Sequence, residues 1–132
     1  MKNKFLTLIF FVVLMFLCGC NKENINIEEG VYKGTFTFTY VSVMQTGQTT
    51  LVLKDGKYSC TGNRSKIPAG GSGTYTINKN KIIFDDENIW LHQFYSNLIL
   101  DGEYNYQLDG KKLRISAIKN DVEYYDYDLE KQ

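Results

Sequence analysis

The chain has 132 residues, of which 43% are hydrophobic, 14% aromatic and 23% charged, with 15 basic and 15 acidic side chains. This is the composition of one ordinary globular domain, and it excludes a disordered or collagen-like chain. No stretch is basic enough to neutralise several phosphates, so a nucleic-acid partner is excluded as well.

The N-terminal segment predicts a secretory signal peptide. Lys2 and Lys4 give it a positively charged start, and residues 5–17 form an uncharged, mainly apolar run. A helix that spans a membrane needs about 20 apolar residues, so this run is too short for one. An N-terminal membrane anchor that stays in the mature protein is the less favoured alternative.

The motif Leu-Cys-Gly-Cys at residues 17–20 follows this run directly. It resembles the lipobox of bacterial lipoproteins, in which an aliphatic residue and two small residues precede a cysteine that receives diacylglycerol before cleavage. The resemblance implies that residues 1–19 are removed, that Cys20 is lipidated, and that residues 20–29 are a polar tether. Asn21 does not resemble the inner-membrane retention signal of some lipoproteins. We therefore expect the protein to be anchored to the outer membrane, on either its periplasmic or its surface face.

Residues 30–132 predict an all-β domain. Runs rich in Val, Ile, Thr, Tyr and Phe alternate with polar residues and are separated by Asp-Gly and Gly-rich turns. The expected strands are residues 31–44, 49–54, 57–62, 73–77, 81–86, 97–100, 103–108, 111–118 and 122–129. Because most links are short, we expect an antiparallel up-and-down meander of eight to nine strands. Closure into a small barrel avoids two unpaired edges.

Two-residue turns predict the register of each hairpin. A turn at residues 55–56 places Leu53 opposite Tyr58 and Leu51 opposite Cys60. The other predicted turns are 47–48, which opposes Met44 to Leu51; 79–80, which opposes Ile77 to Ile82 and Tyr75 to Phe84; 101–102, which opposes Ile99 to Tyr104; and 109–110, which opposes Tyr106 to Leu113 and Tyr104 to Ile115. Nearly every pair is apolar, so each hairpin has one face suited to a core.

Residues 30–32, Gly-Val-Tyr, open the first strand where lipocalins typically have Gly-x-Trp, and the meander ends in the aromatic-rich residues 124–129. On these residues the domain resembles the short lipocalin-like domains of bacterial lipoproteins, members of the calycin superfamily of eight-stranded barrels. The resemblance implies a small apolar ligand. A domain of this size buries only a modest core, so we expect a largely filled interior with a shallow cavity at one mouth.

The sequence predicts a protein that is not an enzyme and that binds no cofactor or metal. His92 is the only histidine, and no Gly-x-Ser-x-Gly motif is present. Cys60 with His92 would supply two zinc ligands where three or four are needed. Cys60 alternates with a tyrosine, which predicts a buried, unreactive thiol. Asp126 and Asp128 share a strand face, but they alternate with tyrosines and are expected to face solvent rather than form a glycosidase pair.

Aromatic side chains are the remaining functional signal. Most must belong to the core, but rigid aromatic residues on loops are typical recognition anchors. Three of them lie in the longest connection outside the glycine-rich loop, and three tyrosines lie on predicted strands. The candidate ligand-binding residues are Trp90, Phe94, Tyr95, Tyr58, Tyr75 and Tyr104.

Two functions stay open at this point. The first is a lipid-anchored binding module for a small apolar or aromatic ligand at the barrel mouth. The alternative is a protein-interaction or inhibitor module with a filled core, which acts through loops 62–72 and 87–97. The partners expected are therefore the membrane, through the anchor, and either a small ligand or a protein.

Overall fold

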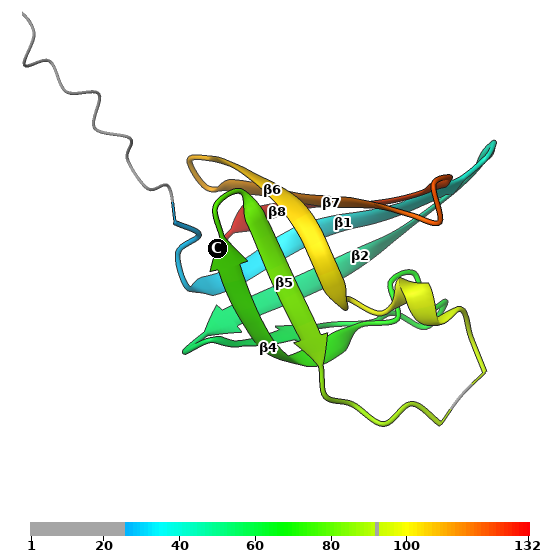
Figure 1. The fold of residues 1–132 in the computed structure, drawn as a ribbon, viewed down its shortest axis with the longest axis horizontal. Helices are drawn as coiled ribbons and strands as arrows, with labels where there is room; N and C mark the ends of the chain where they lie inside the picture. The colour runs from blue at the N-terminus through cyan, green and yellow to red at the C-terminus, as the bar shows by residue number, and fades with distance from the viewer. Residues whose placement is uncertain (1–25, 92) are drawn as a thin grey trace, which may run out of the picture.

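Alternation of apolar and polar side chains produces eight strands in the computed structural model, which describes residues 26–91 and 93–132 (Figure 1). They are β1 (Gly30–Tyr40), β2 (Val43–Lys54), β3 (Lys57–Cys60), β4 (Gly71–Asn78), β5 (Lys81–Asp86), β6 (Gly102–Asp109), β7 (Lys112–Lys119) and β8 (Glu123–Lys131). The predicted signal peptide, the lipidation site Cys20, residues 20–25 of the predicted tether, and His92 lie outside the described residues.

Each strand pairs with its neighbour in the chain, and β8 pairs with β1, so the antiparallel sheet closes into a barrel. The predicted all-β, up-and-down closed meander is confirmed, with eight strands rather than nine. We call the two ends of the barrel proximal and distal. The proximal end contains residues 26–29, the turns 55–56, 79–80 and 110–111, and Gln132. The distal end contains the turns 41–42 and 120–122 and the long connections 61–70 and 87–101.

Two predicted turns and their registers are confirmed. Asp55 and Gly56 both have positive φ, 51° and 71°, as a type I′ hairpin turn requires. The paired residues are Leu53 with Tyr58 and Leu51 with Cys60 in one hairpin, and Ile77 with Ile82 and Tyr75 with Phe84 in the other. In both hairpins the turn residues and the apolar face specify the same pairing.

The turn predicted at residues 47–48 is wrong, because both residues lie inside β2. The chain reverses at residues 41–42 instead, and Leu51 pairs with Tyr32 rather than with Met44. Gly47 serves a close approach: a Cβ built there would lie 1.7 Å from the carbonyl oxygen of Ile67 in the connection 61–70. Gly47 therefore makes room for a crossing loop and does not form a turn.

The register predicted for the 109–110 turn is also wrong. The turn residues are 110–111, so Tyr106 pairs with Ile115 and Leu108 with Leu113. Gly110 has φ of 58° and takes the first turn position, where a positive φ is needed. Because the pairing changes by two residues, every side chain keeps its face, and the predicted inward residues are still inward.

The expected strand 97–100 and the hairpin at 101–102 are absent. Residues Ser96–Leu98 form a short 3₁₀ helix, η2, and Ile99 makes a single parallel bridge to Gly70. Tyr104 pairs with Ile82 of β5 instead of Ile99. This segment is tied to the other long connection rather than to β6.

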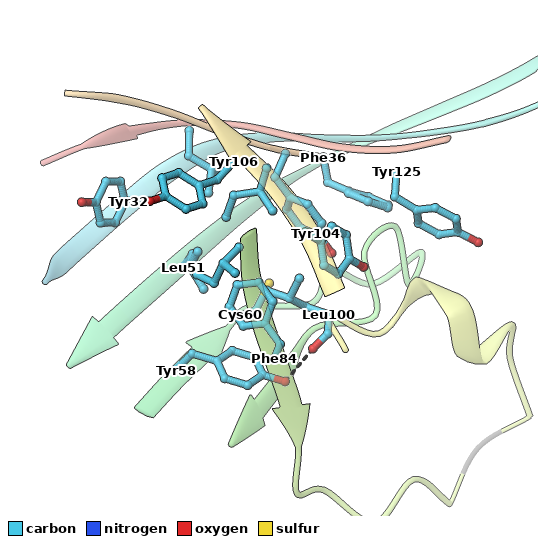
Figure 2. Packing of buried hydrophobic residues seen from close by; sticks show 14 of the residues in the cluster. Tyr32, Phe36, Leu51, Tyr58, Cys60, Phe84, Leu100, Tyr104, Tyr106 and Tyr125 are labelled. Atoms are coloured by element: carbon cyan, nitrogen blue, oxygen red, sulfur yellow. Dashed lines mark hydrogen bonds between the residues drawn. The ribbon is translucent and has the colours of Figure 1, made fainter. Parts of the chain in front are cut away.

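Side chains fill the inside of the barrel (Figure 2). The largest fully buried ones are Tyr32, Tyr104, Tyr125, Tyr127, Phe36, Phe84, Leu51, Leu53, Ile82, Leu100, Leu113 and Ile115. The ring centroids of Phe36 and Tyr127 are 4.5 Å apart, and those of Tyr58 and Phe84 are 4.7 Å apart. Burial of one such side chain contributes about 1.5–3 kcal/mol, so this packed interior is the main source of stability.

Cys60 belongs to this interior, and its predicted burial is confirmed. Its Sγ lies 3.3 Å from Oγ1 of Thr49. Burial raises the pKa of the thiol to about 11, although the contact with Thr49 acts in the other direction. Since the thiolate is the reactive form, Cys60 behaves as a small apolar side chain near neutral pH.

Residues 27–29 pack on the proximal end, so contacts with the barrel begin before residue 30. Ile27 is buried in the core cluster. The carbonyl oxygen of Glu28 accepts a hydrogen bond from the Tyr32 hydroxyl at 2.6 Å, and its carboxylate pairs with Lys131. The Glu29 carboxylate accepts from the Asp55 amide at 2.7 Å. The segment therefore covers the proximal mouth of the barrel.

Candidate functional site

The predicted loop anchors Trp90 and Phe94 lie together at the distal end, and one carboxylate holds Trp90. Asp86, the last residue of β5, accepts a hydrogen bond from the Trp90 indole at 2.6 Å. Its other oxygen accepts from the Ser72 amide at 2.9 Å and from the Asn88 side chain at 2.6 Å. Trp90 and Phe94 are half-buried and pack edge to face, with centroids 5.3 Å apart. A depression of about 280 Å³ lies beside Trp90, against β3 and β4.

The third loop anchor, Tyr95, belongs to a separate polar cluster around Glu123. Glu123 is buried, and its carboxylate accepts hydrogen bonds from the hydroxyls of Tyr95 and Tyr125 and from the amides of Asn97 and Asn120. Burial on its own would raise the pKa of Glu123. The four donors outweigh that cost, and the pKa lies below its ordinary value.

Lys119 covers the interior where β7 reaches the distal end. Its ammonium lies 5.1 Å from the ring centroid of Tyr104 and 4.9 Å from that of Tyr125, within the range of a cation–π contact. It also donates a hydrogen bond to the Asp101 carbonyl oxygen at 3.2 Å. Burial lowers the pKa of Lys119, while the nearby carboxylates of Asp101 and Glu123 oppose that shift.

The three candidate tyrosines on strands lie in different places. Tyr58 is buried and donates a hydrogen bond to the Leu100 carbonyl oxygen at 2.5 Å, as Figure 2 shows. Tyr104 is fully buried. Tyr75 is half-buried on β4, and burial together with the carboxylates of Glu29 and Asp55 raises its pKa. Because Glu29 and Asp55 belong to the proximal end, Tyr75 lies near that end. The six predicted residues therefore do not form one site.

Two buried hydroxyls have no hydrogen-bond partner among the described residues, those of Tyr104 and Tyr127. Their ring centroids are 6.1 Å apart inside the barrel. Burial raises the pKa of both phenols well above its ordinary value. Both groups stay protonated near neutral pH, each with a donor that contacts no acceptor in the part of the chain that is described.

Exposed apolar side chains are distributed unevenly between the two ends. Among the described residues, every large exposed one except Val31 lies at the distal end. They are Tyr40, Val41, Val43, Met44, Ile89, Leu91, Tyr95, Ile118, Val122 and Tyr124. Tyr40 pairs with Val43 and with Glu123, so the tips of the β1–β2 and β7–β8 hairpins are adjacent. We call Tyr40, Val41, Val43, Met44 and Val122 the distal hairpin patch.

Sequence reasoning missed Asp86, Lys119 and Glu123. A signal for the last two is present, because Glu123 alternates in phase with Tyr125 and Tyr127, and Lys119 extends the inward series of β7. A charged residue with inward phase at the end of a strand indicates a polar cluster at the mouth. Asp86 carries no such signal, since it joins Ser72 of β4, 14 residues earlier in the chain, to Asn88 and Trp90 of the connection 87–101.

No protein-family model, curated protein or solved structure matches this chain. Within residues 26–91 and 93–132, no helix is long and apolar enough to cross a membrane. The same residues contain no group of three or more His, Cys, Asp or Glu side chains that could hold a metal ion.

Proposed function

We propose that this chain is a protein-interaction module that binds its partner through the distal hairpin patch. The observation that carries the proposal is the concentration of exposed apolar side chains at one end of the barrel. Single exposed apolar residues are ordinary, but a cluster of them on a soluble surface is typical of a binding site. The lipocalin-like relationship and the non-enzymatic role are part of the same proposal.

Backbone strain at the tip of the β1–β2 hairpin supports a functional role for the patch. Val41 has φ of 54° and is exposed, so it has a left-handed backbone without burial to compensate. A β-branched residue is strongly disfavoured there, and glycine or asparagine would relieve the strain. A strained conformation at an exposed position is typical of a site where function outweighs stability.

The packed interior favours a protein partner over a small ligand inside the barrel. Tyr32, Phe36, Tyr104 and Tyr127 are fully buried and occupy the space that a ligand would need. Loops or hairpins remain as the binding elements. This is the alternative with a filled core, and its proposed site lies at the 41–42 and 120–122 turns instead of the two long connections.

We propose further that Cys20 is lipidated and holds the protein on the outer membrane. Support comes from the lipobox-like residues 17–20 and from residues 26–29, which run along the proximal end. An anchor attached there would leave the distal hairpin patch facing away from its own membrane. Replacement C20S should abolish lipid labelling and leave the precursor uncleaved. A processed, labelled C20S protein would contradict the anchor.

Site-specific photo-crosslinking in cells tests the proposed function. A photoreactive amino acid replaces Val43 in the full chain, and Val31, the exposed valine of the opposite end, is the matched control; their exposures are 54% and 37%. We expect a discrete protein adduct from position 43 and none from position 31. Identical adducts at both positions, or none at position 43, would contradict a partner at the distal hairpin patch. The identified partner should bind the Val41→Gly protein more weakly.

A further inference from the structure

A second surface lies on the outer face of the barrel, across β1, β8, β7 and β6. The register aligns one polar side chain from each strand in a row: Thr37, Asp126, Ser116 and Asn105. Four adjacent strands span about 14 Å at roughly 4.8 Å per step. The row therefore presents hydroxyl, carboxylate, hydroxyl and amide groups at regular intervals.

This row is the floor of a depression of about 290 Å³. Thr37, Ser116 and Asp126 are only half exposed although they face outward, as expected of floor residues. Tyr124 and Arg114 are exposed on the two sides of the row. We call this depression the outer-face groove. It combines a line of polar groups with the ring of Tyr124 at one edge.

The charges of the outer-face groove exclude a simple anion site. Arg114 donates to both oxygens of Asp126, from Nε at 2.9 Å and from Nη2 at 2.8 Å. Asp128 lies directly opposite Arg114 in the register. One positive charge therefore meets two negative charges, and the guanidinium is already engaged. A phosphate or carboxylate ligand would be repelled, and a strongly cationic ligand would have to compete with Arg114.

We propose that the outer-face groove binds a neutral oligosaccharide built of pyranose rings. Sugar hydroxyls are both donors and acceptors, so they match a row that offers both kinds of group. The apolar C–H face of a pyranose ring fits against an aromatic side chain such as Tyr124. The bidentate Arg114–Asp126 pair holds two planar groups in fixed positions, where they can form hydrogen bonds with adjacent sugar hydroxyls. The length of the row is enough for more than one sugar ring.

The dimensions of the groove suit a chain that lies along it rather than a buried small molecule. Its volume is just below the roughly 300–1,000 Å³ of pockets that enclose drug-sized ligands. Much of a bound sugar would stay in solvent, which limits the affinity per atom. We expect dissociation constants on the order of 0.1–1 mM for a tetrasaccharide.

Saturation-transfer NMR with the full chain tests this proposal. The probes are cellotetraose, maltotetraose, mannotetraose and chitotetraose, with tetragalacturonate as the charged comparison. At least one neutral probe should bind, and tetragalacturonate should not. No binding by any neutral probe, or stronger binding of tetragalacturonate, would overturn the proposal.

Variants locate the binding on the molecule. Tyr124→Ala and Asp126→Ala should each weaken binding of that probe about tenfold, a loss of about 1.4 kcal/mol. Tyr124→Phe retains the ring and should restore most of the affinity. Tyr40→Ala is the matched control, since its exposure of 47% is close to the 52% of Tyr124. The assignment would be overturned if the Tyr124→Ala, Asp126→Ala and Tyr40→Ala proteins bound the sugar equally well. Val41→Gly, which tests the protein partner, should leave sugar binding unchanged.

Discussion

The two ends of the barrel are built on opposite principles. At the proximal end, two-residue turns join the strands, and residues 27–29 cover the mouth with a buried isoleucine and paired carboxylates. At the distal end, two short turns and two long connections join the strands, and apolar side chains face solvent. Lys119 and the Glu123 cluster lie at the distal mouth, together with apolar residues of the long connections that are buried in the core, such as Ala69, Leu98 and Leu100.

This difference separates stability from recognition within one small sheet. The proximal end provides hydrogen-bond partners for its backbone groups and buries its apolar surface, as a folded domain requires. The distal end retains exposed apolar residues and a strained turn, which cost stability and therefore indicate another use. Substitutions at the two ends should accordingly change different measured quantities.

The largest effect is expected from two isoleucines, one at each end. Ile27→Ala should lower the free energy of unfolding by about 2–4 kcal/mol, because it removes a side chain that is 6% exposed. Ile89→Ala, at a site that is 88% exposed, should change it by less than about 0.5 kcal/mol. Urea denaturation of both variants measures the difference. A similar loss in both would mean that the two ends contribute equally to folding.

Glu123 should make the stability of the distal end dependent on pH. Its pKa is lowered in the folded state, so its contribution is present above the ordinary value of 4.5 and is lost as pH falls through the lower folded value. Glu123→Gln places an amide donor among four other donors, so it should lower the free energy of unfolding by about 1–3 kcal/mol at neutral pH.

Denaturation from pH 7 to pH 3 checks this expectation. The difference between wild type and Glu123→Gln should shrink as the carboxylate of the wild type becomes protonated. Glu130→Gln, at an exposed position on the same strand, is the control and should change stability little at any pH. A difference that stays constant across the range would show that Glu123 acts through shape alone.

The end that folds by local rules is also the end that the sequence predicts well. The turns at 55–56 and 79–80 follow from their residues, and the inward phase of each strand follows from alternation. The 109–110 error changed the pairing by two residues and preserved the faces. Local signals therefore sufficed for the barrel, its core and most of its proximal turns.

The distal end resisted prediction because its contacts are not local. Gly47 is needed where residue 67 crosses β2, and only the folded chain reveals that approach. The Asp86 carboxylate that orients Trp90 is itself bound to Ser72, 14 residues earlier in the chain, and Tyr95 is oriented by Glu123, 28 residues later. The loop aromatics could be identified as candidates, but alternation and turn chemistry do not specify how a long connection folds back.

A smaller effect, of opposite sign, is expected at the strained turn. Val41→Gly relieves the cost of a left-handed β-branched residue but adds freedom to the unfolded chain, so we expect a net gain of about 0.5–1 kcal/mol. Thermal unfolding should show a rise of a few degrees. Val43→Gly, on extended backbone in the same hairpin, should lower the melting temperature instead. A loss of stability in Val41→Gly would remove the argument from strain.

The smallest effect is expected from Tyr104→Phe, in the region between the two ends, and Tyr58→Phe is its comparison. The Tyr58 hydroxyl donates to Leu100, so Tyr58→Phe leaves a buried carbonyl oxygen without that donor and should cost about 1–2 kcal/mol. The Tyr104 hydroxyl has no partner among the described residues, so Tyr104→Phe should be neutral or slightly stabilising.

Urea denaturation of these two variants decides more than the value of one hydroxyl. If Tyr104→Phe costs as much as Tyr58→Phe, the Tyr104 hydroxyl is bonded in solution to a water or to another small molecule inside the barrel. Native mass spectrometry separates the two, and a retained organic molecule would make the interior a binding site and displace the proposed protein partner. If Tyr104→Phe is neutral, the interior serves folding alone, and recognition falls to the distal hairpin patch and the outer face.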